Sequence, residues 1–258
     1  MAIQKRLRFF IYLSAVMVAT TVPVLAHADA IKCYIGPGVS AGTSNDLRHY
    51  RQPYKFILPL NPETNRRYRP SDIVGMGVDG SNNYNFVWFS NGFVSAGASK
   101  DLGKFRKPSR YQLPINPRTK RRYRPGDIVG MGVDGTNNYN FVWFSNGFVS
   151  AGTSDHLDRF RKPYKYVLPI NPENNRNYRP RDIVGMGIDG SNNYNFVWFY
   201  NGRVSAGTSN DLGRFRKPYR IKRAPAENIR AIDTVGIGID GDNNYNFFWF
   251  VGKDSTVC

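Results

Sequence analysis

The stretch DIVGMGVDGSNNYNFVWF, residues 72–89, decides the fold of this chain because it is repeated almost unchanged. Its copies stand at residues 127–144, 182–199 and 233–250; the first three begin 55 residues apart and the last follows after 51. A second phrase, Val-Ser-Ala-Gly, recurs with its serines at positions 40, 95, 150 and 205. Self-similarity at this length is typical of repeat architectures. A property that is encoded four times favours multivalent binding over catalysis at a single centre.

Each unit predicts four β-strands, as the unit of residues 72–126 illustrates. The expected strands are residues 72–79, 84–89, 93–99 and 109–114. The first is rich in β-branched residues and the second in aromatics, while residues 80–83 and Asn91-Gly92 provide turns between strands. Pro108 and Pro114 bound the fourth strand, which suits a sheet edge. No segment has helical periodicity of useful length, so the chain is predicted to be all-β.

The polarity of these strands predicts a β-propeller. The two inner strands are apolar on both faces, as expected where neighbouring blades pack face to face, and the fourth is basic. Paired glycines on the first strands fit the crowded wall of a narrow central channel: Gly75 and Gly77, Gly130 and Gly132, Gly185 and Gly187, and Gly236 and Gly238. We therefore expect an all-β fold, a four-bladed β-propeller of about 55-residue, four-stranded repeats. An open stack of units is less favoured because neither end carries a polar capping unit.

The repeat region begins and ends partway through a unit, and this predicts how the propeller closes. Residues 39–42 already correspond to a third strand, and residues 245–250 to a second strand. One blade would therefore be shared between the termini, with residues 233–250 and 38–60 completing one sheet and leaving no edge to recruit another chain. Residues 31–35 also align with a second strand and compete with 245–250 for one position. The sequence leaves that choice open.

The first 30 residues precede the repeat and have the pattern of a signal peptide. A basic start, residues 5–8, is followed by an apolar run, residues 9–26, and by small residues around Ala28. A membrane anchor of marginal length is the alternative, but the small-residue end favours removal. We expect residues 1–30 to be a signal peptide and residues 31–258 to be a single propeller domain. The product would be secreted or periplasmic, with no transmembrane segment after cleavage.

Charge and cysteine content indicate the partners and the compartment. The formal net charge of +17, to which the signal segment contributes little, should attract polyanions such as acidic glycans. A solvated basic surface is the alternative, and export makes nucleic acid an unexpected partner in vivo. The two cysteines, Cys33 and Cys258, are expected to form a disulfide in an oxidising compartment. That pairing requires the two ends of the mature chain to lie side by side.

The repeats lack the patterns of an active site, and we predict that the protein is not an enzyme. The three histidines, His27, His49 and His156, stand at unrelated places, and the recurring serines have no base that recurs beside them. The turn after the first strand has one carboxylate, or two in the last copy, whereas calcium loops usually supply several. We therefore expect neither a metal nor a cofactor, because Asp and Asn side chains that satisfy their own turn explain the pattern.

Carbohydrate binding is the positive hypothesis that the repeated turn favours. Aromatic faces and Asn or Asp side chains are the groups that hold sugars. The candidate ligand-binding residues are Asp79, Asn83, Tyr84, Asp134, Asn138, Tyr139, Asp189, Asn193, Tyr194, Asp240, Asn244 and Tyr245. Packing of the tyrosines at the core or rim is the alternative, and Trp88 with its equivalents is expected in the core. Weak sites repeated around a ring would gain avidity on a surface.

Basic residues recur in the long connection that precedes each first strand. Arginine forks suit phosphate, sulfate and carboxylate groups. The candidate polyanion-binding residues are Arg66, Arg67, Arg69, Arg121, Arg122, Arg124, Arg176 and Arg179. A second basic stretch recurs before the fourth strand, at residues 104–107, 159–162 and 214–217. A solvated rim is the alternative for both stretches, and residues 224–231 depart from the pattern.

The unit Asp-Ile-Val-Gly-x-Gly-x-Asp-Gly, followed by Tyr-x-Phe-x-Trp-Phe and Asn-Gly-x-Val-Ser-Ala-Gly, resembles the blades of lectin-type β-propeller repeat proteins, the tachylectin-like group. The resemblance covers residues 38–250 and lies in strand order and turn signals. It implies glycan recognition, although no binding residue of that family carries over by position. We expect a secreted, monomeric, multivalent carbohydrate-binding module that favours acidic glycans or other cell-surface polyanions. The alternative is a structural or protein-binding β-propeller scaffold without a small ligand.

Overall fold

The computed structural model of this protein describes most of the repeat region, namely residues 38–43, 54–79, 81, 84–98, 105–134, 136, 139–153, 160–189, 191, 194–208, 215–220, 233–240 and 245–250. By its contacts the chain divides into Met1–Lys32 and Cys33–Cys258, and every described residue belongs to the second unit. The expected signal peptide and the expected pairing of Cys33 with Cys258 lie outside the described residues. So do four candidate ligand-binding residues, Asn83, Asn138, Asn193 and Asn244.

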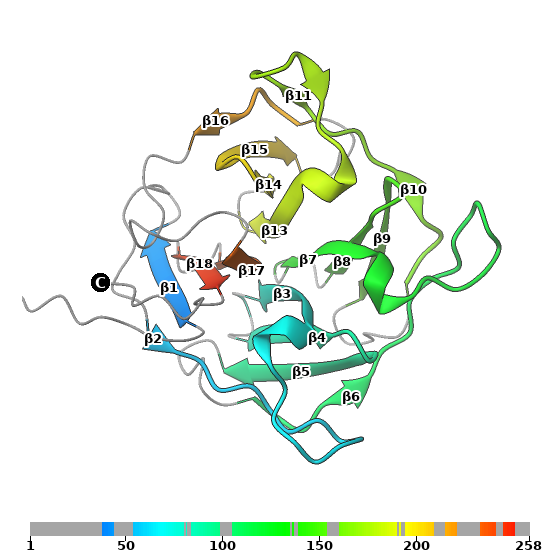
Figure 1. Ribbon diagram of the computed structural model, residues 1–258, viewed down its shortest axis with the longest axis vertical. Coiled ribbons are helices and arrows are strands. Elements are labelled where there is room, and N and C mark those ends of the chain that lie inside the picture. Colours follow the sequence, from blue (N-terminus) through cyan, green and yellow to red (C-terminus); the bar gives the residue numbers. More distant parts are fainter. Residues whose placement is uncertain are drawn as a thin grey trace, which may run out of the picture. The chain divides into compact units, whose positions relative to one another are not determined.

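The described residues form four antiparallel sheets of four strands each (Figure 1). Three sheets follow the chain: β3 (Ile73–Asp79), β4 (Tyr84–Phe89), β5 (Phe93–Ala98) and β6 (Ser109–Arg110); β7 (Ile128–Asp134), β8 (Tyr139–Phe144), β9 (Phe148–Thr153) and β10 (Tyr164–Lys165); β13 (Ile183–Asp189), β14 (Tyr194–Phe199), β15 (Arg203–Thr208) and β16 (Tyr219–Arg220). The fourth combines late and early segments in the order β17 (Thr234–Asp240), β18 (Tyr245–Phe250), β1 (Gly38–Thr43) and β2 (Tyr54–Lys55). β18 thus holds the second position, for which residues 31–35 compete in the sequence.

The inner strands follow the sequence pattern closely, and the outer strand does not. β4 covers Tyr84–Phe89 as expected, because its aromatic and β-branched side chains are buried along nearly its whole length. In the turn that follows, Gly92 has a φ of 86°, which glycine adopts readily. β6 is only two residues long. Directly after it, Tyr111 donates its backbone N–H to the carbonyl of Gly92 in that turn at 3.0 Å.

Glycines on the first strands hold neighbouring sheets at close range. A Cβ added to Gly75 would lie 2.6 Å from Cγ of Met131, and one added to Gly77 would lie 2.9 Å from Cγ2 of Val133. β3 therefore packs directly on β7. The two strands run in the same direction, since a step of two residues along β3 corresponds to a step of two residues along β7 in the same sense. The same kind of contact joins β7 to β13, β13 to β17 and β17 to β3, whose places are seen in Figure 1.

The core lies between the sheets and is largely aromatic. Trp88, Trp143 and Trp249 are completely buried, as predicted. Trp88 belongs to a cluster with Met131 and Phe144 of the next sheet, so the tryptophans join neighbouring sheets.

No helix among the residues that the structure describes has the length and hydrophobicity needed to cross a bilayer.

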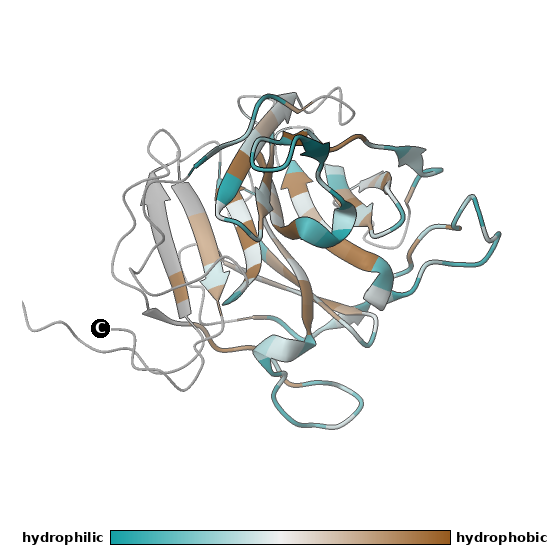
Figure 2. Cartoon of the chain, turned by 45° about the horizontal axis from the view of Figure 1, so that its top comes forward, coloured by the Kyte–Doolittle hydropathy of each residue, from teal (hydrophilic) through white to brown (hydrophobic). Residues whose placement is uncertain are grey.

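The long connections that lead into the first strands, expected to be polar loops, are short hairpins. We call residues 60–67, 115–122 and 170–177 the hairpin connections. β11 (Ile170–Asn171) pairs with β12 (Arg176–Asn177) in the third, and single bridges replace this pairing in the other two. Their turns contain residues with left-handed φ, namely Asn65, Lys120 and Asn175. Figure 2 shows that these connections are hydrophilic over most of their length, whereas the strands carry the hydrophobic residues.

A tyrosine and a short helix anchor the end of each hairpin connection. The tyrosine stacks on a phenylalanine of the second strand with 3.6 Å between ring centroids; the pairs are Tyr68 with Phe89, Tyr123 with Phe144 and Tyr178 with Phe199. One turn of 3₁₀ helix then leads into the first strand: η1 (Pro70–Asp72), η2 (Pro125–Asp127) and η3 (Pro180–Asp182). Stacked rings at this distance fix the hairpin connection on the core.

We predict that Gly75→Ala destabilises the protein by about 1–3 kcal/mol, because the added methyl group would overlap Cβ and Cγ of Met131. Urea unfolding followed by tryptophan fluorescence measures the change in the free energy of unfolding. Gly126→Ala is the matched control, because a Cβ there meets nothing within 4 Å, and its effect should stay within about 0.5 kcal/mol. Equal stabilities of the two variants would show that the contact between first strands is not tight.

Candidate functional site

Each sheet has two ends, and the candidate residues are divided between them. β3 and β4 pair Asp79 with Tyr84 at one end and Ile73 with Phe89 at the other. We call the first the turn end and the second the hairpin end, where the hairpin connections lead into the first strands. Strands of this length span about 20 Å, so the two ends are separate surfaces. Since the first strands run in the same direction, corresponding residues of the four sheets lie at the same end.

At the turn end, a tyrosine and an arginine form the same contact in three sheets, and we call these contacts the Tyr–Arg pairs. Nη2 of Arg106 donates to the hydroxyl of Tyr84 at 2.7 Å, and the guanidinium carbon lies 4.7 Å from the centroid of the tyrosine ring. The two distances are 2.8 and 4.8 Å for Arg161 with Tyr139, and 3.1 and 5.0 Å for Arg216 with Tyr194. The tyrosines are half-buried and the arginines are exposed.

The backbone of each paired arginine is fixed to the third strand. The N–H of Arg106 donates to the carbonyl of Ala96 at 2.7 Å, and the hydroxyl of Ser95 donates to the carbonyl of Arg106 at 2.5 Å. Ser150 and Ser205 make the same bond to Arg161 and Arg216. The serines of the recurring Val-Ser-Ala-Gly phrase therefore position the arginines, and their hydroxyl protons are directed to a carbonyl.

The candidate aspartates at the turn end are buried. Asp79, Asp134, Asp189 and Asp240 end the first strands with at most 5% of their surface exposed, and none is without a partner. These carboxylates are thus far less exposed than the arginines of the Tyr–Arg pairs. Within the described ranges, no group of three or more His, Cys, Asp or Glu side chains is placed to hold a metal ion.

The tyrosine and its arginine are separate candidates in the sequence, and only the structure joins them. The tyrosines belong to the repeated turn, while Arg106, Arg161 and Arg216 lie in the basic stretch before the fourth strand. The constant separation of 22 residues between partners is the signal that could have revealed the pair. The side chain of Tyr245, the fourth candidate tyrosine, lies outside the described part of the chain.

The candidate polyanion-binding arginines lie at the hairpin end, and they are not equivalent. All eight are exposed. Nη1 of Arg67 donates to the carbonyl of Leu58 at 2.5 Å and Nη1 of Arg122 to that of Leu113 at 2.6 Å, so these two brace their own connections. Arg69, Arg124 and Arg179 donate their backbone N–H to the aspartate three residues later. Arg66, Arg121 and Arg176, one in each hairpin connection, make no such side-chain bond to other described residues.

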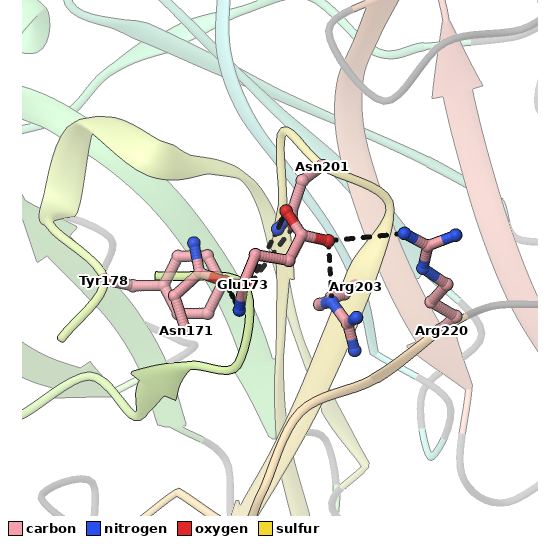
Figure 3. A network of polar contacts seen from close by, with 6 residues as sticks. All are labelled: Asn171, Glu173, Tyr178, Asn201, Arg203 and Arg220. Atoms are coloured by element: carbon pink, nitrogen blue, oxygen red, sulfur yellow. Dashed lines mark hydrogen bonds and ion pairs between the residues drawn. The ribbon is translucent and has the colours of Figure 1, made fainter. Parts of the chain in front are cut away.

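A glutamate ties the third hairpin connection to its sheet (Figure 3). Oε1 of Glu173 accepts from Nε of Arg203 at 3.1 Å and from Nη2 of Arg220 at 3.4 Å. Oε2 accepts from Nδ2 of Asn201 at 3.1 Å. The bond from Asn201 and then that from Arg203 lower the pKa of the Glu173 carboxyl below its ordinary value. Burial raises the pKa of the neighbouring Tyr178 hydroxyl, which donates to Oδ1 of Asn201 at 3.2 Å.

The first sheet repeats this arrangement and the second does not. Oε1 of Glu63 accepts from Arg110 at 2.7 Å, and Oε2 accepts from Nδ2 of Asn91 at 3.2 Å. In the second hairpin connection Arg118 replaces the glutamate, and its guanidinium carbon lies 5.4 Å from the ring centroid of Phe148. Sequence reasoning missed these residues, although a charge reversal at one position of an otherwise similar hairpin was a visible signal.

Comparison with known proteins finds a likeness for one part of the repeat. Residues 174–199, which run from the third hairpin connection through β14, match a family described as a polyglycine hydrolase-like structural repeat. No curated protein matches the chain. Together with the four-stranded sheets, the family match is consistent with a repeat β-propeller, and it does not support the lectin type that the resemblance implies.

Similar solved structures share little sequence with this chain. The structure of U3-55K and the crystal structure of RRP9 WD40 repeats are each 6% identical with a TM-score of 0.34, over 65% of this chain and 42% of theirs. The hydrazine synthase of Kuenenia stuttgartiensis is 8% identical with a TM-score of 0.34, over 72% of this chain and 44% of that one. The matches thus span less than half the length of each of these proteins.

We predict that the Glu173 carboxyl titrates below its ordinary pKa in the folded protein. Because folding lowers the pKa of Glu173, the ionised carboxylate stabilises the folded protein. This stabilisation is complete at a pH above the ordinary glutamate pKa, and it is lost as the pH falls through the lowered pKa of the folded protein. Carbon-detected NMR of the side-chain carboxyl follows the titration. Asn201→Ala removes the largest cause and should raise the pKa of Glu173, while Asn146→Ala, the equivalent change in the second sheet, should leave it unchanged. A Glu173 pKa that does not respond to Asn201→Ala would contradict the assignment.

Proposed function

We propose that this chain is an exported, non-catalytic β-propeller of four blades that binds acidic glycans through its Tyr–Arg pairs. Two observations support the closed ring. One sheet joins β17 and β18 to β1 and β2, and the first strands contact one another in the order β3, β7, β13, β17 and β3 again. A ring of this kind leaves each inner strand with neighbours on both sides, which suits the burial of both its faces.

The observation that carries the proposal is the recurrence of the Tyr–Arg pair at the turn end of three sheets. The guanidinium carbon of each arginine lies 4.7 to 5.0 Å from the centroid of its tyrosine ring, and one N–H donates to the hydroxyl. Its remaining N–H groups are available to a carboxylate or sulfate group, which arginine binds with a fixed fork geometry. The tyrosine hydroxyl, which accepts from the arginine, keeps its own proton to donate to a ligand oxygen. One pair therefore offers a cation, a hydroxyl donor and an aromatic edge.

Repetition makes such pairs effective even if each binds weakly. Equivalent pairs lie at the same end of parallel first strands, so they face the same side of the unit. Linked sites can exceed the affinity of one site by a factor of about 10² to 10⁴ when a ligand engages several at once. A polysaccharide with regularly spaced acidic groups is a ligand of that kind.

Non-catalytic action is supported by the way the recurring polar groups are used. The hydroxyls of Ser95, Ser150 and Ser205 donate to backbone carbonyls. A serine nucleophile needs a base as its partner instead. The matched family is described by its likeness to a hydrolase and also as a structural repeat. We propose that this chain shares the repeat and not a hydrolase activity.

We predict that changing Arg106, Arg161 and Arg216 together to Lys weakens binding to immobilised polygalacturonate by about 10²-fold, because lysine keeps the charge but loses the fork and the stacking. Surface plasmon resonance at two salt concentrations measures the affinity. The matched control changes Arg66, Arg121 and Arg176 to Lys, three exposed arginines at the hairpin end, and should leave the affinity unchanged. Equal effects of the two triple variants, or complete loss of wild-type binding in moderate salt, would reduce the interaction to general charge attraction.

We also propose that the chain is exported and that a disulfide joins its two cysteines, which lie outside the residues that the structure describes. We predict that the mature protein begins near Asp29 or Ile31 and that Cys33 and Cys258 are joined. Intact mass spectrometry after alkylation under denaturing, non-reducing conditions should find no modified thiol, and reduction should expose both. Two alkylated thiols before reduction would refute the disulfide, and a mass that includes residues 1–28 would refute cleavage.

A further inference from the structure

The second hairpin connection lacks the glutamate that, in the other two, accepts hydrogen bonds from the neighbouring sheet strands and turn. In the first and third sheets, Glu63 and Glu173 accept from an asparagine in the turn after the second strand and from an arginine in the fourth strand. The contacts of Glu63 measure 2.7 and 3.2 Å, and those of Glu173 measure 3.1 to 3.4 Å. In these two units a carboxylate at this position therefore links the hairpin connection to its sheet.

The second sheet keeps the donors and replaces the acceptor with a cation. Asn146 is the equivalent asparagine, and its Nδ2 donates to the Tyr123 hydroxyl at 2.8 Å and to Oδ1 of Asn116 at 3.3 Å. Lys165 takes the place of the strand arginine, opposite Phe148 in the β9–β10 register. Arg118 takes the place of the glutamate, over the Phe148 ring. The donors of this cluster thus have no carboxylate from their own unit.

The second hairpin connection is uniformly basic in sequence. The second hairpin connection carries Arg118, Lys120, Arg121 and Arg122 and has no acidic residue, while the first and third each contain a glutamate. The side chains of Arg118 and Lys165 are both exposed, so their charges are accessible. Ile115, three residues before Arg118 in the same hairpin connection, is 47% exposed and adds an apolar contact. A ligand for this surface should combine a carboxylate with aliphatic groups.

We propose that this cluster, made of Arg118, Asn146, Phe148 and Lys165, docks a glutamate or aspartate side chain of a partner polypeptide. The incoming carboxylate would take the place that Glu63 and Glu173 occupy in the other sheets. It would accept from Asn146, in place of the 3.3 Å bond of Asn146 to Asn116, and from the two cations. An acidic peptide fits better than an acidic sugar, because the group it replaces is a glutamate side chain and because Ile115 offers contact to neighbouring aliphatic side chains. Charge-assisted bonds to an arginine and a lysine supply the attraction.

This site is independent of the proposed glycan binding, because the Tyr–Arg pairs lie at the opposite end of the sheets. Loss of polygalacturonate binding in the variants of Arg106, Arg161 and Arg216 would leave it untouched. The two proposals can therefore fail separately.

Fluorescence anisotropy with a labelled oligoglutamate peptide tests the proposal on the full mature chain. Arg118→Glu should weaken binding by about tenfold or more, because the new glutamate would accept from Asn146 and Lys165 as Glu63 and Glu173 do in their sheets. The variant should fold, since glutamate stands at this position in two other units. Arg121→Glu makes the same change in charge on the same hairpin connection, at a side chain with no bond to the described residues of the cluster, and should weaken binding by no more than about threefold.

A gain-of-function variant completes the test. Glu63→Arg converts the first sheet, which has Arg110 opposite Phe93, into the arrangement of the second and should raise the stoichiometry from one peptide to two. Equal losses in Arg118→Glu and Arg121→Glu would overturn the proposal in favour of diffuse charge attraction. A stoichiometry that stays at one in Glu63→Arg would overturn it as well. Tighter binding of an oligogalacturonate of equal charge, lost in Arg118→Glu, would show that the cluster is a sugar site.

Discussion

The contact between a glycine of one first strand and a large side chain of the next is the constraint on which the rest of this structure depends. Gly75 leaves room for Met131, Gly130 for Met186, Gly185 for Ile237 and Gly236 for Met76. Dispersion attraction is lost within a fraction of an ångström, so the sheets keep their packing only if these positions lack a side chain. The second glycine of each strand makes the equivalent contact two residues further along both strands, so the two contacts together fix direction as well as distance. All first strands therefore run the same way, and like ends of the sheets lie together.

This arrangement gives the protein two surfaces with different chemistry. At the turn end the Tyr–Arg pair is the same in three sheets, which is the reason for the proposal that these pairs bind a repeated ligand. At the hairpin end the units diverge, because Arg118 stands where Glu63 and Glu173 complete the contacts of their own sheets. If both proposals hold, this protein combines a repeated binding surface with a site that exists in one copy. The difference between units carries as much functional information as their similarity.

Local pattern predicts the inner strands well and the outer parts of each unit poorly. The limits of β4 and the burial of Trp88 follow from a run of apolar residues that has one stable placement between two packed sheets. β6 and the hairpin connections depend instead on bonds between distant residues, such as that of Tyr111 to Gly92. The basic residues show the same limit, since Arg67 looks free in the sequence but donates to the carbonyl of Leu58.

The sequence by itself determined the repeat, the order of strands, the hairpin turns and the buried tryptophans, because these follow from spacing and from the apolar content of short segments. The tertiary structure decided which side chains meet. It joined Tyr84 to Arg106, buried Asp79 and placed the candidate arginines at the end of the sheets away from the candidate tyrosines. Such pairings depend on strand register and on the packing of one sheet against the next, and no local pattern encodes a contact between residues that only the completed sheets bring together.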